Sequence, residues 1–119
     1  GPEVQKYLGT TIEEFLKKRY AVLKTQELAD QFSREFFTEF KNNEIKGVKS
    51  FEGDFFVINV MLYNSIVKQI LSCVLSKNFT IEELSQKTGK ECELLKIAIE
   101  FLKEEGKIVE KRKNQYTLI

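Results

Sequence analysis

Residue types that commonly carry out chemistry are scarce in this sequence. Histidine is absent, which removes the commonest general base and the commonest zinc ligand. The two cysteines, Cys73 and Cys92, do not have the spacing of a metal site. No glycine-rich phosphate loop occurs, and the acidic segment Glu52-Gly53-Asp54 has too few ligands for a calcium loop. We therefore expect no catalytic, metal-binding or cofactor-binding residue, and a protein that is not an enzyme.

Both cysteines lie in segments with helical apolar patterns, which favours buried free thiols, although a disulfide between them stays open. No signal peptide is present, and no apolar run approaches the roughly 18–20 residues of a membrane span. These features predict an intracellular protein without a membrane segment. The opening residues, Gly1 and Pro2, look like the remnant of a cleaved expression tag.

The chemistry that the sequence does suggest is binding through charge. The 19 basic and 18 acidic side chains give a net charge of +1, which argues against a strongly electrostatic nucleic-acid binder. The positive charge gathers near the C-terminus, where one acid, Glu110, accompanies four bases: Lys107, Lys111, Arg112 and Lys113. Such a cluster suits a solvated turn, a weak contact to nucleic acid, or an acidic protein segment.

In the first half of the chain, helical periodicity gives way to an alternating pattern. Thr11 and Glu14 have the spacing of a capping box, which predicts a helix over 11–23. Two shorter helices are expected over 25–32 and 33–42. The second of these is expected to bury three phenylalanines: Phe36, Phe37 and Phe40. A β-hairpin over 45–60, turning at the acidic segment 52–54, completes this half.

The second half repeats this order more clearly. Apolar spacing predicts helices over 62–75, 81–87 and 91–105, the second opened by a capping box at Thr80 and closed at Gly89. Two short strands and a basic loop follow: 107–110, 115–119 and the joining Lys111-Arg112-Lys113-Asn114.

Helix, short helix, longer helix and hairpin is the order of a winged helix-turn-helix. We therefore predict a mainly α chain with small β-hairpins. Its parts are a tag remnant (1–2), a degenerate winged-helix-like unit or helical extension (3–60) and a winged helix-turn-helix (61–119).

In a winged helix that reads DNA, the third helix enters the major groove with a basic or amide-rich outward face. Here the outward face is expected to carry three acids and two bases: Glu93, Lys96, Glu100, Lys103 and Glu104. Phosphates repel such a face, which favours a protein partner. Ile97, at the margin of the apolar arc, is either buried or part of a partner groove. The candidate partner-binding residues are Lys96, Ile97, Glu100, Lys103, Lys111, Arg112 and Lys113.

The second half resembles a particular family. The segments 64–73, 78–84 and 95–108 are similar to the C-terminal winged helix of the middle subunit of replication protein A. The wider arrangement resembles the Stn subunit of the telomeric CST complex, with two winged helices in tandem. It includes Glu14-Phe15-Leu16, Gln26-Glu27-Leu28, Phe55-Phe56-Val57 and the pair Ile108-Val109 and Tyr116-Thr117. In that family such domains recruit other proteins.

The resemblance implies a nuclear protein–protein interaction module of a DNA replication or telomere-maintenance complex, with other protein subunits as partners. Two alternatives stay open. One is a DNA-binding winged-helix transcription regulator that uses the basic wing. The other is an adaptor winged helix of a cullin- or ESCRT-type complex.

Overall fold

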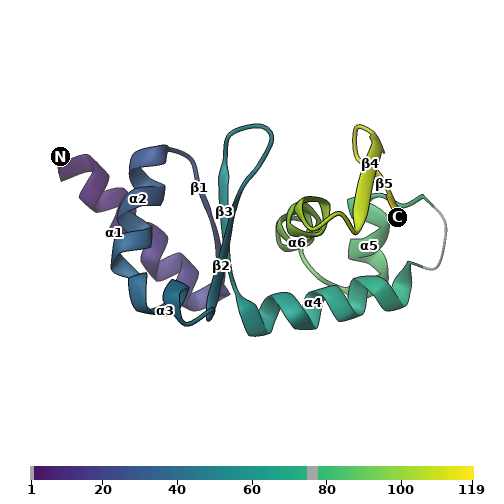
Figure 1. The fold of residues 1–119 in the computed structure, drawn as a ribbon, viewed down its shortest axis with the longest axis horizontal. Coiled ribbons are helices and arrows are strands. Elements are labelled where there is room, and N and C mark those ends of the chain that lie inside the picture. The colour runs from purple at the N-terminus through teal and green to yellow at the C-terminus, as the bar shows by residue number, and fades with distance from the viewer. Residues whose placement is uncertain (1, 75–77) are drawn as a thin grey trace. The chain divides into compact units, whose positions relative to one another are not determined.

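The computed structural model describes residues 2–74 and 78–119, and the chain divides into two units, one ending at Leu62 and the other beginning at Tyr63. The predicted boundary lay between residues 60 and 61. In chain order the elements (Figure 1) are α1 (Pro2–Lys18), β1 (Tyr20–Leu23), α2 (Gln26–Glu35), α3 (Phe37–Lys41), β2 (Ile45–Lys49), β3 (Phe55–Asn59), α4 (Val60–Cys73), α5 (Ile81–Thr88), α6 (Cys92–Glu104), β4 (Ile108–Arg112) and β5 (Gln115–Leu118). The chain is mainly helical with small antiparallel sheets, as predicted in outline, but the first sheet has three strands where a two-stranded hairpin was expected.

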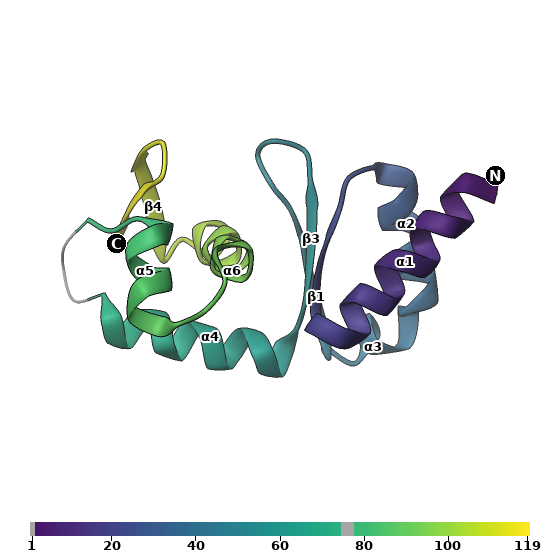
Figure 2. The ribbon, with the colours of Figure 1, turned by 180° about the vertical axis from the view of Figure 1, so that it is seen from behind.

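The first unit is a three-stranded antiparallel sheet with helices against one face. The strand order is β1-β3-β2, with Ala21 and Gly47 both opposite Val57 in the central strand. Helices α1, α2 and α3 lie on the same side of this sheet in both views (Figures 1 and 2). Because successive strand residues point to opposite faces, Ala21, Leu23 and Val57 all reach the helical side.

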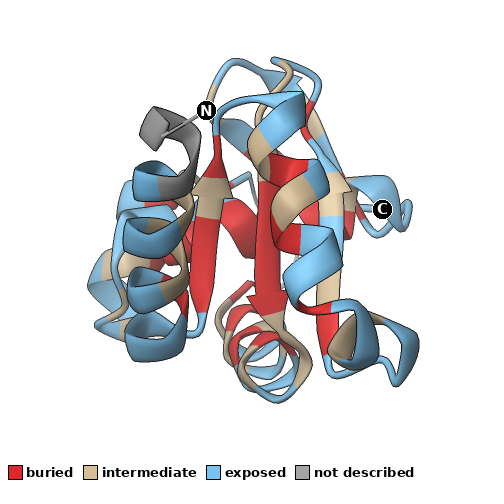
Figure 3. Cartoon of the chain, turned by 90° about the vertical axis from the view of Figure 1, so that its left-hand side faces the viewer, coloured by how far each residue is buried: buried red, intermediate tan, exposed pale blue. Residues whose placement is uncertain are grey.

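Phenylalanines from two helices form the centre of the first unit. The rings of Phe15 and Phe32 are 5.2 Å apart and nearly perpendicular, and those of Phe32 and Phe36 are 4.6 Å apart. Figure 3 shows the strands largely in the colour of buried residues and the outer helical surfaces in the colour of exposed ones. The aromatic pairs join α1 to α2, because edge-on pairs add attraction to the area they bury, and the same cluster packs against apolar side chains of the sheet.

The predicted helix over 11–23 is wrong at both ends. Helix α1 already begins at Pro2, so Thr11 is an interior residue and not a cap. The helix ends because Arg19 adopts a left-handed backbone conformation (φ 70°), and its side chain donates to Oδ1 of Asn59 at 3.0 Å. Residues 20–23 then form β1, since pairing with β3 outweighs the helical spacing of Tyr20 and Leu23.

The boundary between the next two helices was also misplaced. Helix α2 runs on to Glu35, and the separate helix over 33–42 is only the short α3. Phe36 is buried as predicted, but Phe40 is only half-buried and the Phe37 side chain is 64% exposed. Phe37 begins α3 after the break at Phe36, and this break takes its side chain out of the inward arc.

The second unit follows the sequence more closely. Thr80 accepts a hydrogen bond from the N–H of Glu83 at the start of α5, and Gly89 ends that helix in the left-handed region (φ 72°). Gly106 (φ 73°) ends the turn after α6 and allows the chain to enter β4. These three positions are where the local signals were strongest, and they are confirmed.

The two units share one topology. In each, a helix is followed by a short extended segment, two helices and a hairpin. In the first unit the extended segment is β1, which pairs with the second strand of the hairpin, β3. In the second it is Phe79, whose N–H and carbonyl both bond to Tyr116 in the second hairpin strand, at 2.8 and 2.9 Å. The first half of the chain, in which the sequence pattern is less clear, therefore has the same arrangement of elements as the second half.

The cysteine prediction is correct in one respect. Both thiols are free, but Cys73 is half-buried and Cys92 is exposed. Cys92 is the first residue of α6 and lies two positions before Leu94, the first buried residue of that helix. Within the part of the chain that the structure describes, no helix is long and apolar enough to cross a membrane.

Candidate interaction surface

Helix α6 is buried over more of its circumference than its outward charges indicate. Its buried residues are Leu94, Leu95, Ile97, Ala98, Ile99, Phe101 and Leu102. Ile97 is 1% exposed, so this candidate residue offers no surface to a partner, and its margin position belongs to the core. An aspartate at position 97 would place an uncompensated charge in that core and would report on folding and not on binding.

The remaining charged side chains of α6 fall into two groups. Glu93, Lys96 and Glu104 are exposed, whereas Glu100 and Lys103 are half-buried. The Lys103 ammonium lies 3.2 Å from the Glu100 carboxylate and 2.9 Å from that of Glu110 on β4. Through its ion pair with Glu110, Lys103 therefore links α6 to the β4–β5 hairpin.

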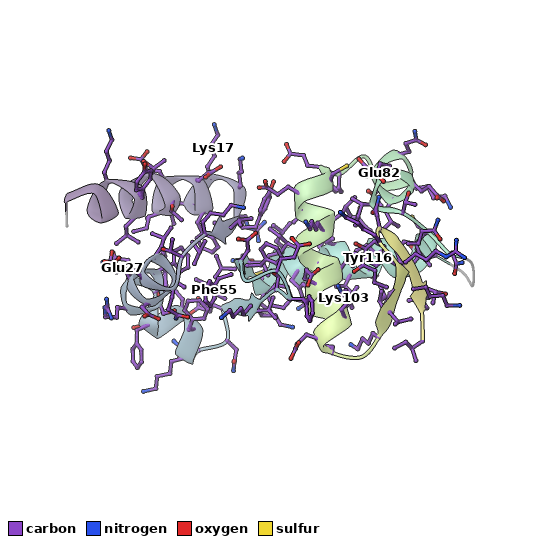
Figure 4. The ribbon with its side chains drawn as sticks, turned by 90° about the horizontal axis from the view of Figure 1, so that it is seen from above. Lys17, Glu27, Phe55, Glu82, Lys103 and Tyr116 are labelled. Atoms are coloured by element: carbon purple, nitrogen blue, oxygen red, sulfur yellow. The ribbon has the colours of Figure 1, made fainter. Side chains whose placement is uncertain are left out.

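The contacts around Lys103 and Glu110 shift the pKa values of three side chains. Burial alone raises the pKa of Glu110, but hydrogen bonds from the Asn114 N–H and from Lys103 outweigh it and hold the pKa below the ordinary value. Burial alone lowers the pKa of Lys103, yet the hydrogen bond to Glu110 and the charge of Glu100 raise it overall. Burial and the charge of Glu110 raise the pKa of Tyr116 to about 12. Figure 4 labels Lys103 on α6 and Tyr116 on the neighbouring hairpin.

A second set of contacts fixes the tip of the hairpin. Asn114 takes the left-handed conformation (φ 61°) that the turn requires. Its backbone N–H donates to Glu110 at 2.9 Å, and its side-chain amide donates to Glu82 in the first turn of α5 at 2.7 Å. The hairpin tip is thus bound to α5 as well as to α6. Sequence reasoning singled out neither Asn114 nor Glu82, although an Asn at a hairpin turn is a signal that could have found it.

The basic cluster remains on the surface. Lys111 and Arg112 belong to β4, not to the predicted loop, and the turn consists of residues 113–114. Lys111, Arg112 and Lys113 are exposed, and among the described residues none of the three forms an ion pair. Glu110, the acid that accompanies them in the sequence, points inward to Lys103. The exposed hairpin surface is therefore more basic than the sequence count indicates.

The raised phenol pKa predicts a loss of stability in alkali. The folded chain keeps the Tyr116 proton up to about pH 12, whereas an unfolded tyrosine releases it near pH 10. The stabilisation is thus complete below pH 10 and is lost as the pH rises towards 12. We expect the free energy of unfolding, measured in urea, to fall over this interval. Tyr116→Phe should weaken this pH dependence, whereas Tyr7→Phe at an exposed tyrosine should retain it. An unchanged pH dependence in Tyr116→Phe would show that the loss of stability does not come from the raised pKa of Tyr116.

Comparisons with known proteins are sparse. No family model matches the chain, and no curated protein sequence matches it. Among solved structures, the chain is similar to the crystal structure of a bacterial selenocysteine-specific elongation factor, EF-Sec, with a TM-score of 0.53 and 14% sequence identity. The match covers 100% of this chain and 18% of the elongation factor, so the chain spans less than a fifth of that protein. At this identity the likeness concerns the fold alone.

Proposed function

We propose that the chain is a non-enzymatic protein–protein interaction module, built from two winged helices in tandem. It would serve as a nuclear subunit of a replication protein A-like or CST-like complex in DNA replication or telomere maintenance. The shared topology of the two units supports the tandem arrangement. Equivalent hairpins follow the third helix of each unit, and each hairpin pairs through its second strand with an extended segment before the second helix.

One observation carries the choice of a protein partner: the third helix of the second unit has no free basic face. Its half-buried cation, Lys103, is committed to Glu100 and Glu110. The exposed charges that remain are Glu93, Lys96 and Glu104, a net charge of −1. A helix that reads base edges must approach phosphates closely, and this face would be repelled by them. The same mixture of charges suits the rim of a protein interface.

A second candidate function is DNA binding through the wing. It is favoured by Lys111, Arg112 and Lys113, which are exposed and form no ion pair with the residues that the structure describes, since such side chains suit phosphate contacts. Three such contacts would give a salt-dependent affinity with a slope of roughly −3 in log K against log salt. Without a contribution from α6, this binding would be weak and independent of sequence.

Affinity capture from nuclear extract tests the protein-binding proposal. We expect Lys96→Glu to reduce capture of a specific protein about tenfold or more, which corresponds to about 1.4 kcal/mol of binding energy. Lys17→Glu, an equal charge reversal at an exposed site on α1, should leave capture unchanged. Nuclease treatment of the extract should also have no effect. Capture that depends on nuclease-sensitive material, or that is indifferent to Lys96→Glu, would argue against this surface.

A further inference from the structure

The outward face of the β4–β5 hairpin combines apolar and basic side chains. Val109 pairs with Thr117, and the N–H of Ile119 bonds to the carbonyl of Lys107 at 3.1 Å. Alternation along the strands places these four residues on one side, opposite the buried Ile108 and Tyr116. We call the set Lys107, Val109, Thr117 and Ile119 the hairpin face.

Two apolar side chains on this face are open to solvent. Val109 is 41% exposed and Ile119 is 80% exposed. Their neighbours are cations: Lys107 lies on the face itself, and Lys111 and Arg112 continue β4 beyond it. Glu110, the acid of this hairpin, pairs with Lys103 on the inner side and forms no ion pair with those cations among the described residues. The face therefore offers apolar contact within a positive field.

The hairpin presents this face in a fixed orientation. Lys103 holds Glu110 from α6, and Asn114 holds Glu82 from α5. A surface held at both the strand and the turn loses little conformational entropy when a ligand binds. Addition of a further strand at the outer edge of β4 is disfavoured, because the register shift between Glu110 and Arg112 interrupts that edge and Lys111 lies within it. The face, not the edge, is the surface available to a partner.

Charge and apolar exposure together select the occupant. Nucleic-acid phosphates would satisfy Lys107, Lys111 and Arg112, but would leave Val109 and Ile119 uncovered. The exposed acids of α6, Glu93 and Glu104, would also repel a duplex that extended beyond the hairpin. A protein segment that carries carboxylates and aliphatic side chains meets both requirements of the face.

We infer that the hairpin face binds an acidic protein segment in which aliphatic residues alternate with aspartate or glutamate. The aliphatic side chains cover Val109 and Ile119, and the carboxylates pair with Lys107, Lys111 and Arg112. This inference rests on the proposed function and specifies the chemistry of the partner. It assigns the basic wing to a protein partner, so that the exposed part of α6, including Lys96, serves as the adjoining rim.

A synthetic peptide tests the inference directly. The probe is an alternating leucine–aspartate peptide of about eight residues, which spans about 26 Å when extended. Backbone amide NMR shifts of the full chain should change mainly over residues 107–119. The dissociation constant should rise about tenfold for Lys111→Glu/Arg112→Glu and about threefold for Val109→Ser. The matched controls, Lys17→Glu/Lys41→Glu and Leu16→Ser, change exposed residues of the first unit and should have no effect.

Two results would overturn the inference. One is equal affinity for a peptide in which serine replaces every leucine, because binding would then need charge alone. The other is the absence of shift changes at the hairpin in the folded wild-type chain. If the peptide fails but Lys96→Glu still reduces protein capture, the hairpin inference is wrong and the proposed function stands. If the peptide binds but nuclear capture is nuclease-sensitive, the proposed function fails independently.

Discussion

Phe32→Ala is expected to lower the free energy of unfolding by about 3–5 kcal/mol, the range for removing a buried aromatic ring. Phe32 is fully buried in the first unit, with its ring 5.2 Å from that of Phe15 and 4.6 Å from that of Phe36. The substitution would open a cavity between the helices and the sheet and remove three aromatic pairs, those with Phe15, Phe36 and Phe40. Urea unfolding followed by far-ultraviolet circular dichroism measures the change.

Phe37→Ala is the matched control, because it deletes the same side chain five positions along at an exposed site. Its effect should stay within about 0.5 kcal/mol. Similar losses in the two variants would show that the cluster around Phe32 is not the centre of the first unit. The sequence alone could not show that Phe37 is less buried than Phe32, since Phe37 was expected to be buried together with Phe36 and Phe40.

Leu95→Ala is expected to destabilise the second unit by about 2–5 kcal/mol. Leu95 is fully buried on the inner side of α6, next in the chain to Lys96 on its outer side. Loss of its packing should loosen α6. This should weaken the ion pair between Lys103 and Glu110, which links α6 to the hairpin. We therefore expect the amide NMR signals of the hairpin to broaden or shift in this variant at temperatures where the wild type is rigid.

Leu71→Ala on α4 is the corresponding control, since Leu71 is exposed in the same unit. Its unfolding midpoint and hairpin signals should match those of the wild type. If Leu95→Ala were equally silent, α6 would not be the central helix of its unit. The orientation assigned to Lys96 would then have no support.

Local signals in the sequence predicted the second unit well because each of them determines where a helix begins or ends without help from distant residues. A threonine followed three residues later by glutamate opens α5 at Thr80, and left-handed glycines end α5 and follow α6, at Gly89 and Gly106. The apolar arc of α6 was also predicted, with its margin residue Ile97 left open. The structure places Ile97 in the core, which is a matter of tertiary packing that helical spacing does not determine.

The first unit was harder to predict because long-range pairing determines its elements. Residues 20–23 fit a helical face, but strand β3, more than thirty positions away, recruits them into a sheet. Arg19 makes the break in a left-handed conformation, which is rare for that residue type and leaves no composition signal. A capping-box pattern at Thr11 and Glu14 occurred by chance inside a longer helix.

For the candidate surface, the residue types were visible in the sequence but their pairing was not. Lys103 and Lys96 looked equivalent on a helical wheel, yet Lys103 is bound to Glu100 and Glu110 while Lys96 is exposed. In the sequence, Glu110 reduces the net positive charge of the segment that contains Lys111, Arg112 and Lys113, yet its side chain faces inward to Lys103. Asn114 fixes the hairpin to α5 across more than thirty positions of sequence, a contact that no local pattern predicts.

A salt titration of binding to duplex and single-stranded DNA distinguishes a protein partner from a nucleic-acid partner. A protein-binding surface predicts dissociation constants no tighter than the non-specific range of about 10⁻⁴–10⁻⁶ M at physiological salt. It also predicts the same weak affinity for every sequence. Sub-micromolar binding that weakens steeply with salt, and that is lost in Lys111→Glu/Arg112→Glu/Lys113→Glu, would contradict a protein partner. It would show that these three side chains bind DNA.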